Sequence, residues 1–253
     1  MRRHAAGRAR NLAGAVLLLA SAGPAAARCG DAPGPRVDWT GCSKPQLMLG
    51  NDDLTGGVFS KAVLNFTDFS GAKLSGARFD EAELSLVKFQ GADLSGANLT
   101  KAVAWRANFT KANLEKASFT TAQMSRSVFV QAKLAGANFS KSELNRSDLT
   151  GADLSGADLS KAELARVNFT DAKLSGVDFD DSNLSRARLA GLDLSGVKMA
   201  GAHLFRTQLR GANLARAVGL TQPQLDIACG GPDTKLPAGL NPPKGWPCQE
   251  DDE

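Results

Sequence analysis

Residues 152–174 read ADLSGADLSKAELARVNFTDAKL, and Leu or Phe recurs in them at every fifth position. The same period extends in both directions without an insertion, from Leu49 to Leu214. Two residues before each large residue lies a small one, which is Ala in 20 of the 31 units from Leu64 to Leu214. A period of five matches neither a helix nor a flat strand, so the segment predicts a repeat architecture.

The repeat has few exceptions, and they help to define its geometry. Ala104, Met124 and Met199 replace Leu or Phe, and Leu192 is the one bulky residue at the small position. Each unit supplies one short extended side and one turn, so four units close a square coil. The large and small residues then point inward, the other three face water, and stacked coils pair backbone to backbone at ~4.8 Å.

The distribution of Phe supports this fourfold coil. All ten Phe residues at repeat centres have numbers ending in nine, and none has a number ending in four. Residues ten apart lie on opposite sides of a square coil, so Phe occupies one pair of sides and Leu the other. One column is Leu in every coil from Leu54 to Leu214, which is typical of a solenoid whose coils contact only their neighbours.

Units such as Ala152-Asp153-Leu154-Ser155-Gly156 and Ala97-Asn98-Leu99-Thr100-Lys101 resemble the A-[DN]-[LF]-x-x signature of pentapeptide-repeat proteins. The resemblance covers about two thirds of the chain. It implies an all-β fold, a right-handed quadrilateral parallel β-helix, and residues 49–218 are long enough for about eight coils, or ~40 Å of stack. It implies little about function, because most members have none assigned. The best-understood members are DNA mimics that bind type II topoisomerases.

Two segments without the repeat precede residues 49–218. Residues 1–27 are typical of a signal peptide, with Arg near the start, an apolar run at 12–20 and small residues before a cleavage site after Ala27. We therefore expect an exported protein, in the bacterial periplasm or outside the cell, with no transmembrane segment after cleavage. The mature chain would have 26 basic and 26 acidic residues. Residues 28–48 are expected to cap the first coil, with Trp39 over it, because an open solenoid end promotes aggregation.

A second cap is expected at residues 219–253. Thr221-Gln222-Pro223-Gln224 has a capping-box pattern with Pro early in the helix, which predicts a short helix to about Ala228, followed by a Pro-rich tail. Four Cys in an exported chain predict two disulfides. Bridged Cα atoms lie within ~7 Å of each other, and the caps are at opposite ends of the stack. The expected pairs are therefore Cys29 with Cys42 and Cys229 with Cys248. The alternative is metal binding, but the sequence has no Cys-x-x-Cys pair.

The sequence offers little catalytic chemistry. It has no Tyr, and His203, at an outward position, is the one His after residue 27. No Ser–His–acid set, phosphate-binding loop or dinucleotide fingerprint occurs. We therefore expect no enzymatic activity, no cofactor and no bound metal; an enzyme would need a pocket in one of the caps.

One outward column carries an unusual charge pattern. Every twentieth residue from Phe66 reads Phe66, Leu86 and then Arg in six consecutive coils, and Trp105 and Phe205 face outward on the same side. Stacked like charges repel unless something offsets them. These residues are the candidate interaction strip: Arg106, Arg126, Arg146, Arg166, Arg186, Arg206, Trp105 and Phe205.

Two interpretations of the strip remain open. In the first, the Arg residues serve the rod itself, through pairs such as Glu143 with Arg146 and Glu163 with Arg166, and through stems that shield the turns. In the second, they bind an extended anionic partner, which is either an acidic protein or an anionic component of the cell envelope, such as a polysaccharide or lipid head groups. We expect a structural or interaction rod. The alternative is a topoisomerase-binding DNA mimic, which needs a negative surface, whereas residues 49–218 carry 21 basic and 18 acidic residues; export also argues against it, and no nucleic-acid partner is expected.

Overall fold

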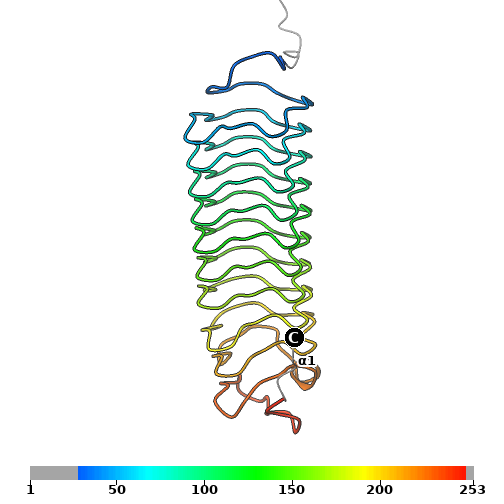
Figure 1. The fold of residues 1–253 in the computed structure, drawn as a ribbon. Helices are drawn as coiled ribbons and strands as arrows, with labels where there is room; N and C mark the ends of the chain where they lie inside the picture. Colours follow the sequence, from blue (N-terminus) through cyan, green and yellow to red (C-terminus); the bar gives the residue numbers. More distant parts are fainter. Residues whose placement is uncertain (1–27, 249–253) are drawn as a thin grey trace, which may run out of the picture.

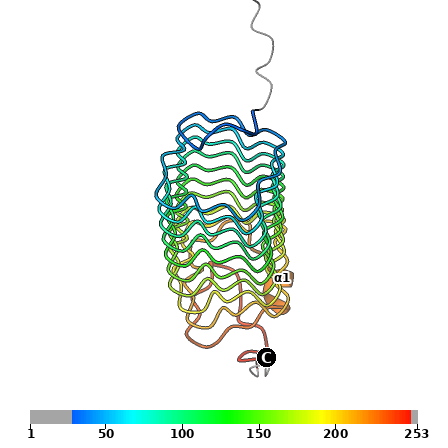
Figure 2. The ribbon, with the colours of Figure 1, turned by 45° about the horizontal axis from the view of Figure 1, so that its top comes forward.

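The computed structural model describes residues 28–248. The predicted signal peptide, residues 1–27, lies outside the described residues, as do residues 249–253. The described chain forms an elongated rod of stacked coils, blue at its N-terminal end and red at its C-terminal end (Figure 1). Figure 2 shows the coils following one another along the rod with little change in outline.

Parallel backbone pairing joins each coil to the next. β-Bridges link residues 20 apart, from Asp38 with Val58 to Lys198 with Val218. Each coil of 20 residues therefore holds four units of the five-residue repeat. No strand longer than one bridge occurs in residues 28–248, because every side of the coil is short and ends in a turn.

The interior of the rod is filled by the large and small residues of the repeat. Phe rings of successive coils stack, with ring centroids 4.5 Å apart for Phe119 and Phe139. Rings from opposite sides meet edge to face, at 5.9 Å for Phe129 and Phe139. Both geometries are favourable for aromatic rings. Burial is complete for nearly every inward residue, as for Leu154.

The backbone pairing begins earlier than the predicted repeat segment 49–218. Asp38 already bridges Val58, so part of the predicted cap 28–48 follows the coil register. Trp39 is 1% exposed and its ring meets that of Phe59 edge to face at 5.7 Å. It therefore occupies the inward column of Phe59, and the coil there lacks the Leu or Phe pattern because Trp39 and the disulfide-bonded Cys42 fill the inward positions.

The C-terminal segment closes the other end. Helix α1, Gln222–Asp226, starts just after Thr221, whose N–H donates to Gln224 Oε1 at 2.9 Å. It lies beside the last coils near the C-terminal end (Figure 1), with Leu225 buried. Beyond it, Cys229 and Lys235 extend the parallel pairing of the last coils.

Each end of the rod carries one disulfide. The Cα atoms are 5.6 Å apart in Cys29–Cys42 and 5.3 Å apart in Cys229–Cys248. These are the pairs expected from the sequence, and no free Cys occurs among residues 28–248. Each bond closes a short loop within one end segment.

Candidate functional site

The six Arg residues of the predicted strip lie at one corner of the rod. Each is an exposed turn residue, and the 20-residue register places them in successive coils. The amide N–H of Arg126 donates to Asn145 O at 2.9 Å and that of Arg146 to Ala165 O at 2.9 Å. Their backbones thus follow the ~4.8 Å spacing of a parallel ladder. We call this set the Arg column: Arg106, Arg126, Arg146, Arg166, Arg186 and Arg206.

The backbone of the Arg column is left-handed. The φ angles run from 54° at Arg106 to 62° at Arg126, a region that costs an L-residue roughly 1–2 kcal/mol and that Gly adopts freely. The diagonally opposite corner has the same conformation and is mostly Gly, as at Gly56, Gly76 and Gly96 with φ of 64–66°. The neighbouring Lys-rich corner also has residues other than Gly at positive φ, but its column includes Gly201. Arg is therefore kept where the backbone favours Gly.

Most of the Arg column is not neutralised from within. Among residues 28–248, Arg106, Arg126, Arg146, Arg166 and Arg186 take part in no ion pair. The pairs of Glu143 with Arg146 and Glu163 with Arg166 do not form. Glu163 Oε2 instead accepts a hydrogen bond from Asn183 Nδ2 at 2.8 Å.

Elsewhere on the rod, charges of successive coils do pair. Lys198 Nζ lies 2.9 Å from Asp178 Oδ2, and Lys173 Nζ lies 3.5 Å from Asp153 Oδ2. Further pairs of residues 20 apart are Lys61–Glu81, Lys73–Asp53 and Lys88–Asp68. The 20-residue register thus places opposite charges together at several points, whereas in the Arg column it places like charges together.

The aromatic residues of the predicted strip frame the Arg column. Trp105 is 52% exposed beside Arg106, and Phe205 is 43% exposed beside Arg206. The Arg206 guanidinium carbon lies 5.8 Å from the Phe205 ring centroid, a cation–π contact, and the ring of His203 stacks on the same Phe205 at 6.4 Å. The contribution of His203 was not expected; its outward position two residues before Phe205 is the sequence signal for it.

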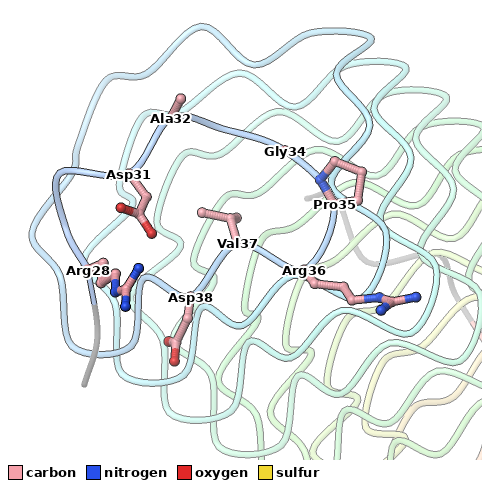
Figure 3. A pocket seen from close by; sticks show the side chains of 8 residues that line it. All are labelled: Arg28, Asp31, Ala32, Gly34, Pro35, Arg36, Val37 and Asp38. Atoms are coloured by element: carbon pink, nitrogen blue, oxygen red, sulfur yellow. The ribbon is translucent and has the colours of Figure 1, made fainter. Parts of the chain in front are cut away.

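A second candidate lies at the N-terminal end, where a pocket of about 360 Å³ is lined by Arg28, Asp31, Arg36 and Asp38 among others. Figure 3 shows Arg28 between Asp31 and Asp38, with Arg36 directed away from them. Hydrogen bonds from the Thr40 hydroxyl and amide hold the pKa of Asp38 below its ordinary value. Two Arg and two Asp give the lining of this pocket no formal net charge.

Other chemistry is sparse in the part of the chain that the structure describes. No group of three or more His, Cys, Asp or Glu is placed there to hold a metal ion. No helix of residues 28–248 has the length and apolar character needed to cross a membrane. The Arg column and its aromatic neighbours are thus the most distinctive surface feature of the described rod.

Comparison of the sequence with known families agrees with the repeat. A profile described as "Pentapeptide repeats (8 copies)" matches residues 53–85, 88–126 and 182–218. A second, described as "Pentapeptide repeat region", matches residues 122–199. The chain belongs to the pentapeptide-repeat family. Among curated proteins none matches.

Several solved pentapeptide-repeat structures resemble the rod. HetL, involved in heterocyst differentiation regulation in Nostoc sp. strain PCC 7120, is 29% identical over 80% of this chain and 94% of its own, with a TM-score of 0.32. Full-length QnrB1, a plasmid-mediated fluoroquinolone resistance protein, is 20% identical over 75% and 94%, with a TM-score of 0.39. A protein of the Arabidopsis thaliana thylakoid lumen is 24% identical over 59% and 82%, with a TM-score of 0.29. At these TM-scores the superpositions transfer none of those roles to this chain.

Proposed function

We propose that this pentapeptide-repeat protein is a non-enzymatic interaction rod, exported to the bacterial periplasm or beyond, that binds an anionic partner along the Arg column. Residues 49–218 of the rod are a right-handed quadrilateral β-helix of about eight coils, as the family resemblance implies. The partner is an acidic protein or an anionic component of the cell envelope.

One observation supports the proposal above all others. Five Arg side chains stand exposed in consecutive coils without an ion pair among the described residues, on a backbone with φ of 54–62° that favours Gly. Residues other than Gly adopt positive φ at all four corners of the rod, so the exposed charge without an ion pair is what distinguishes these Arg residues. An intramolecular role through ion pairs would require acidic partners, and the expected partner Glu163 is hydrogen-bonded to Asn183 instead. Shielding of the turns by the Arg stems is then the intramolecular alternative.

A soluble polyanion tests the proposal. The probes are heparin and polyglutamate, measured at low and at high salt against the triple variant Arg126→Gln/Arg146→Gln/Arg166→Gln. Exposed contacts contribute only ~0–1 kcal/mol each, so single changes should have small effects while the triple variant loses most of its salt-sensitive affinity.

The matched control is Lys111→Gln/Lys116→Gln/Lys133→Gln. It removes the same charge at exposed positions, two of them at φ 58°, and none of the three lies in an ion pair within residues 28–248. Equal losses from both triple variants would mean that net charge matters and the Arg column does not.

The DNA-mimic alternative remains less favoured, because the repeat segment carries 21 basic and 18 acidic residues. A gyrase supercoiling assay addresses it directly. Inhibition or protection of the enzyme at stoichiometric amounts of protein would revive the alternative.

A further inference from the structure

The corner that carries the Arg column is apolar at one end. Ahead of Arg106, the same turn position holds Leu86 and Phe66, which are 42% and 54% exposed. The Leu86 N–H donates to Trp105 O at 2.9 Å and the Phe66 N–H to Ser85 O at 3.0 Å. Phe66, Leu86 and Trp105 therefore occupy three adjacent coils, and we call them the apolar end.

Within residues 49–214, exposed large apolar side chains are confined to this corner. Between residues 49 and 214, the large apolar residues that stand exposed are Phe66, Leu86, Trp105 and Phe205, and all four lie there. The other exposed ones of the described chain, Met48, Val218 and Ile227, lie outside that range. Grouping of exposed apolar residues at one place indicates a contact surface.

Phe66 and Leu86 lie at turn positions where the backbone is left-handed. Their φ angles are 64° and 60°, and bulky residues in that region are outliers. In the corresponding coils the diagonally opposite corner has Gly76 and Gly96, both at φ 64°. The chain thus keeps large apolar side chains where both the backbone and the solvent disfavour them.

We infer that the corner binds an anionic lipid surface, with the apolar end in the interfacial region and the Arg column on lipid headgroups. The inference rests on the proposed function, and it names the partner. From Phe66 to Arg206 the corner spans seven coil steps, or ~34 Å at the strand spacing. A bilayer offers both hydrocarbon and repeated negative charge over such a length, and Trp, Phe and Leu with Arg are the side chains that surface-bound proteins use there. A soluble polyanion such as heparin or polyglutamate accounts for the Arg column but offers no hydrocarbon to Phe66 and Leu86, and an acidic protein would need exposed apolar side chains of its own at the right distance.

The test uses the full chain with vesicles of phosphatidylcholine alone or mixed with phosphatidylglycerol. Trp105 is the reporter, because Trp39 is buried and Trp246 packs against the core. We expect a blue shift of Trp fluorescence with the anionic vesicles, quenching by brominated lipids, and the loss of both signals in Trp105→Phe. These readouts report on the corner itself and not on residues 1–27.

The decisive variant is Phe66→Asn/Leu86→Asn, since Asn tolerates positive φ. Its control, Gly76→Asn/Gly96→Asn, adds the same side chains in the same backbone conformation where no neighbouring atom lies within 4 Å of a new Cβ. Removing two apolar contacts should lower partitioning into anionic vesicles roughly tenfold or more, and the control should not. Thermal unfolding verifies that both variants are folded.

Three results would overturn the inference. In the first, the protein binds vesicles, but Phe66→Asn/Leu86→Asn does not weaken binding and Trp105 fluorescence does not change. The contact would then be purely electrostatic, and the proposed function would still hold. In the second, the protein binds heparin or polyglutamate but not vesicles. The proposed function would still hold, but the partner would be a soluble polyanion or acidic protein and not a lipid surface. Binding to no anionic probe would overturn both.

Discussion

Leu192 lies against Ala172 of the preceding coil, and on their side of the rod the parallel ladder is interrupted. Both are 8% exposed, whereas Ala152 and Ala212 in the same column are fully buried. The amide groups of Asp171, Leu174, Gly176 and Asp193 are without the backbone acceptors that their counterparts have in the neighbouring coils. We infer that Leu192, at a position that is otherwise small, is too large for the two coils to pair there.

Leu192→Ala should let the ladder close. Four recovered hydrogen bonds at ~0.5–1.5 kcal/mol each offset the lost burial of Leu at ~1.5–3 kcal/mol, so overall stability should change little. Hydrogen exchange should nevertheless slow at the four unpaired amides: Asp171, Leu174, Gly176 and Asp193. Val177→Ala, also at a buried small position, is the control; slowing in it, or no slowing in Leu192→Ala, would contradict this explanation.

Two columns of the core should differ in how they tolerate substitution. Leu84, Ala104 and Met124 follow one another and are all fully buried. Met is flexible enough to fill irregular space, so we expect Ala104→Leu to be tolerated or stabilising. Leu154→Ala, in the all-Leu column, should cost ~2–5 kcal/mol. Urea unfolding measures both, and equal effects would mean that the columns are wrongly assigned.

Acid should weaken the rod through its turn aspartates. Hydrogen bonds from the Ser155 hydroxyl, at 2.6 Å, and from its amide, at 3.1 Å, hold the pKa of Asp153 below its ordinary value. A depressed pKa in the folded state contributes stability that is complete above the unfolded pKa of ~3.9 and is lost as the pH falls through the folded pKa.

Asn can replace Asp at this position, because Asn98 and Asn138 accept the same turn hydrogen bond from Thr100 N and Ser140 N at 3.0 and 2.8 Å. Asp153→Asn should therefore keep the turn. Between pH 6 and pH ~2, which is below the ordinary pKa of Asp, the urea midpoint of this variant should fall less than that of the wild type. Unchanged pH dependence in Asp153→Asn and in Asp68→Asn, whose pKa is likewise lowered, would contradict this origin.

The intact mass of the secreted protein should report both signal cleavage and disulfide formation. We expect cleavage after Ala27, so that the secreted protein starts at Arg28 and lacks four thiol hydrogens because of two disulfides. Each disulfide closes a short loop and should add ~2–3 kcal/mol to its end of the rod. A retained N-terminus, or free thiols in exported material, would show that the prediction of residues 1–27 or of the redox compartment is wrong.

The sequence predicts the repeat well because nearly all inward positions alternate between a small residue and a Leu or Phe two residues later. Leu192, visible in the sequence as the one bulky residue at a small position, also marks where the ladder breaks. The sequence does not place Trp39, because a residue outside the repeat has no period, and the backbone pairing is what assigns it to the column of Phe59.

The surface is less predictable than the core. The Arg column follows from the period alone. The lack of ion pairs at its members Arg106 to Arg186 within residues 28–248 does not, since Glu163 could have paired with Arg166 and instead binds Asn183. The positive φ of these turns is likewise not evident from Arg, which gives no signal for a left-handed backbone.

The central claim is that the Arg column exists for binding and not for the rod. Stability and binding can both be measured in the variant Arg126→Gly/Arg146→Gly/Arg166→Gly/Arg186→Gly. Gly removes the charge, and it also relieves the strain of the left-handed backbone, which should stabilise the fold by up to ~1 kcal/mol per site. We predict that the free energy of unfolding rises or holds while salt-sensitive binding to heparin and to anionic vesicles is lost. A variant that unfolds more easily and binds both probes as the wild type does would contradict the claim.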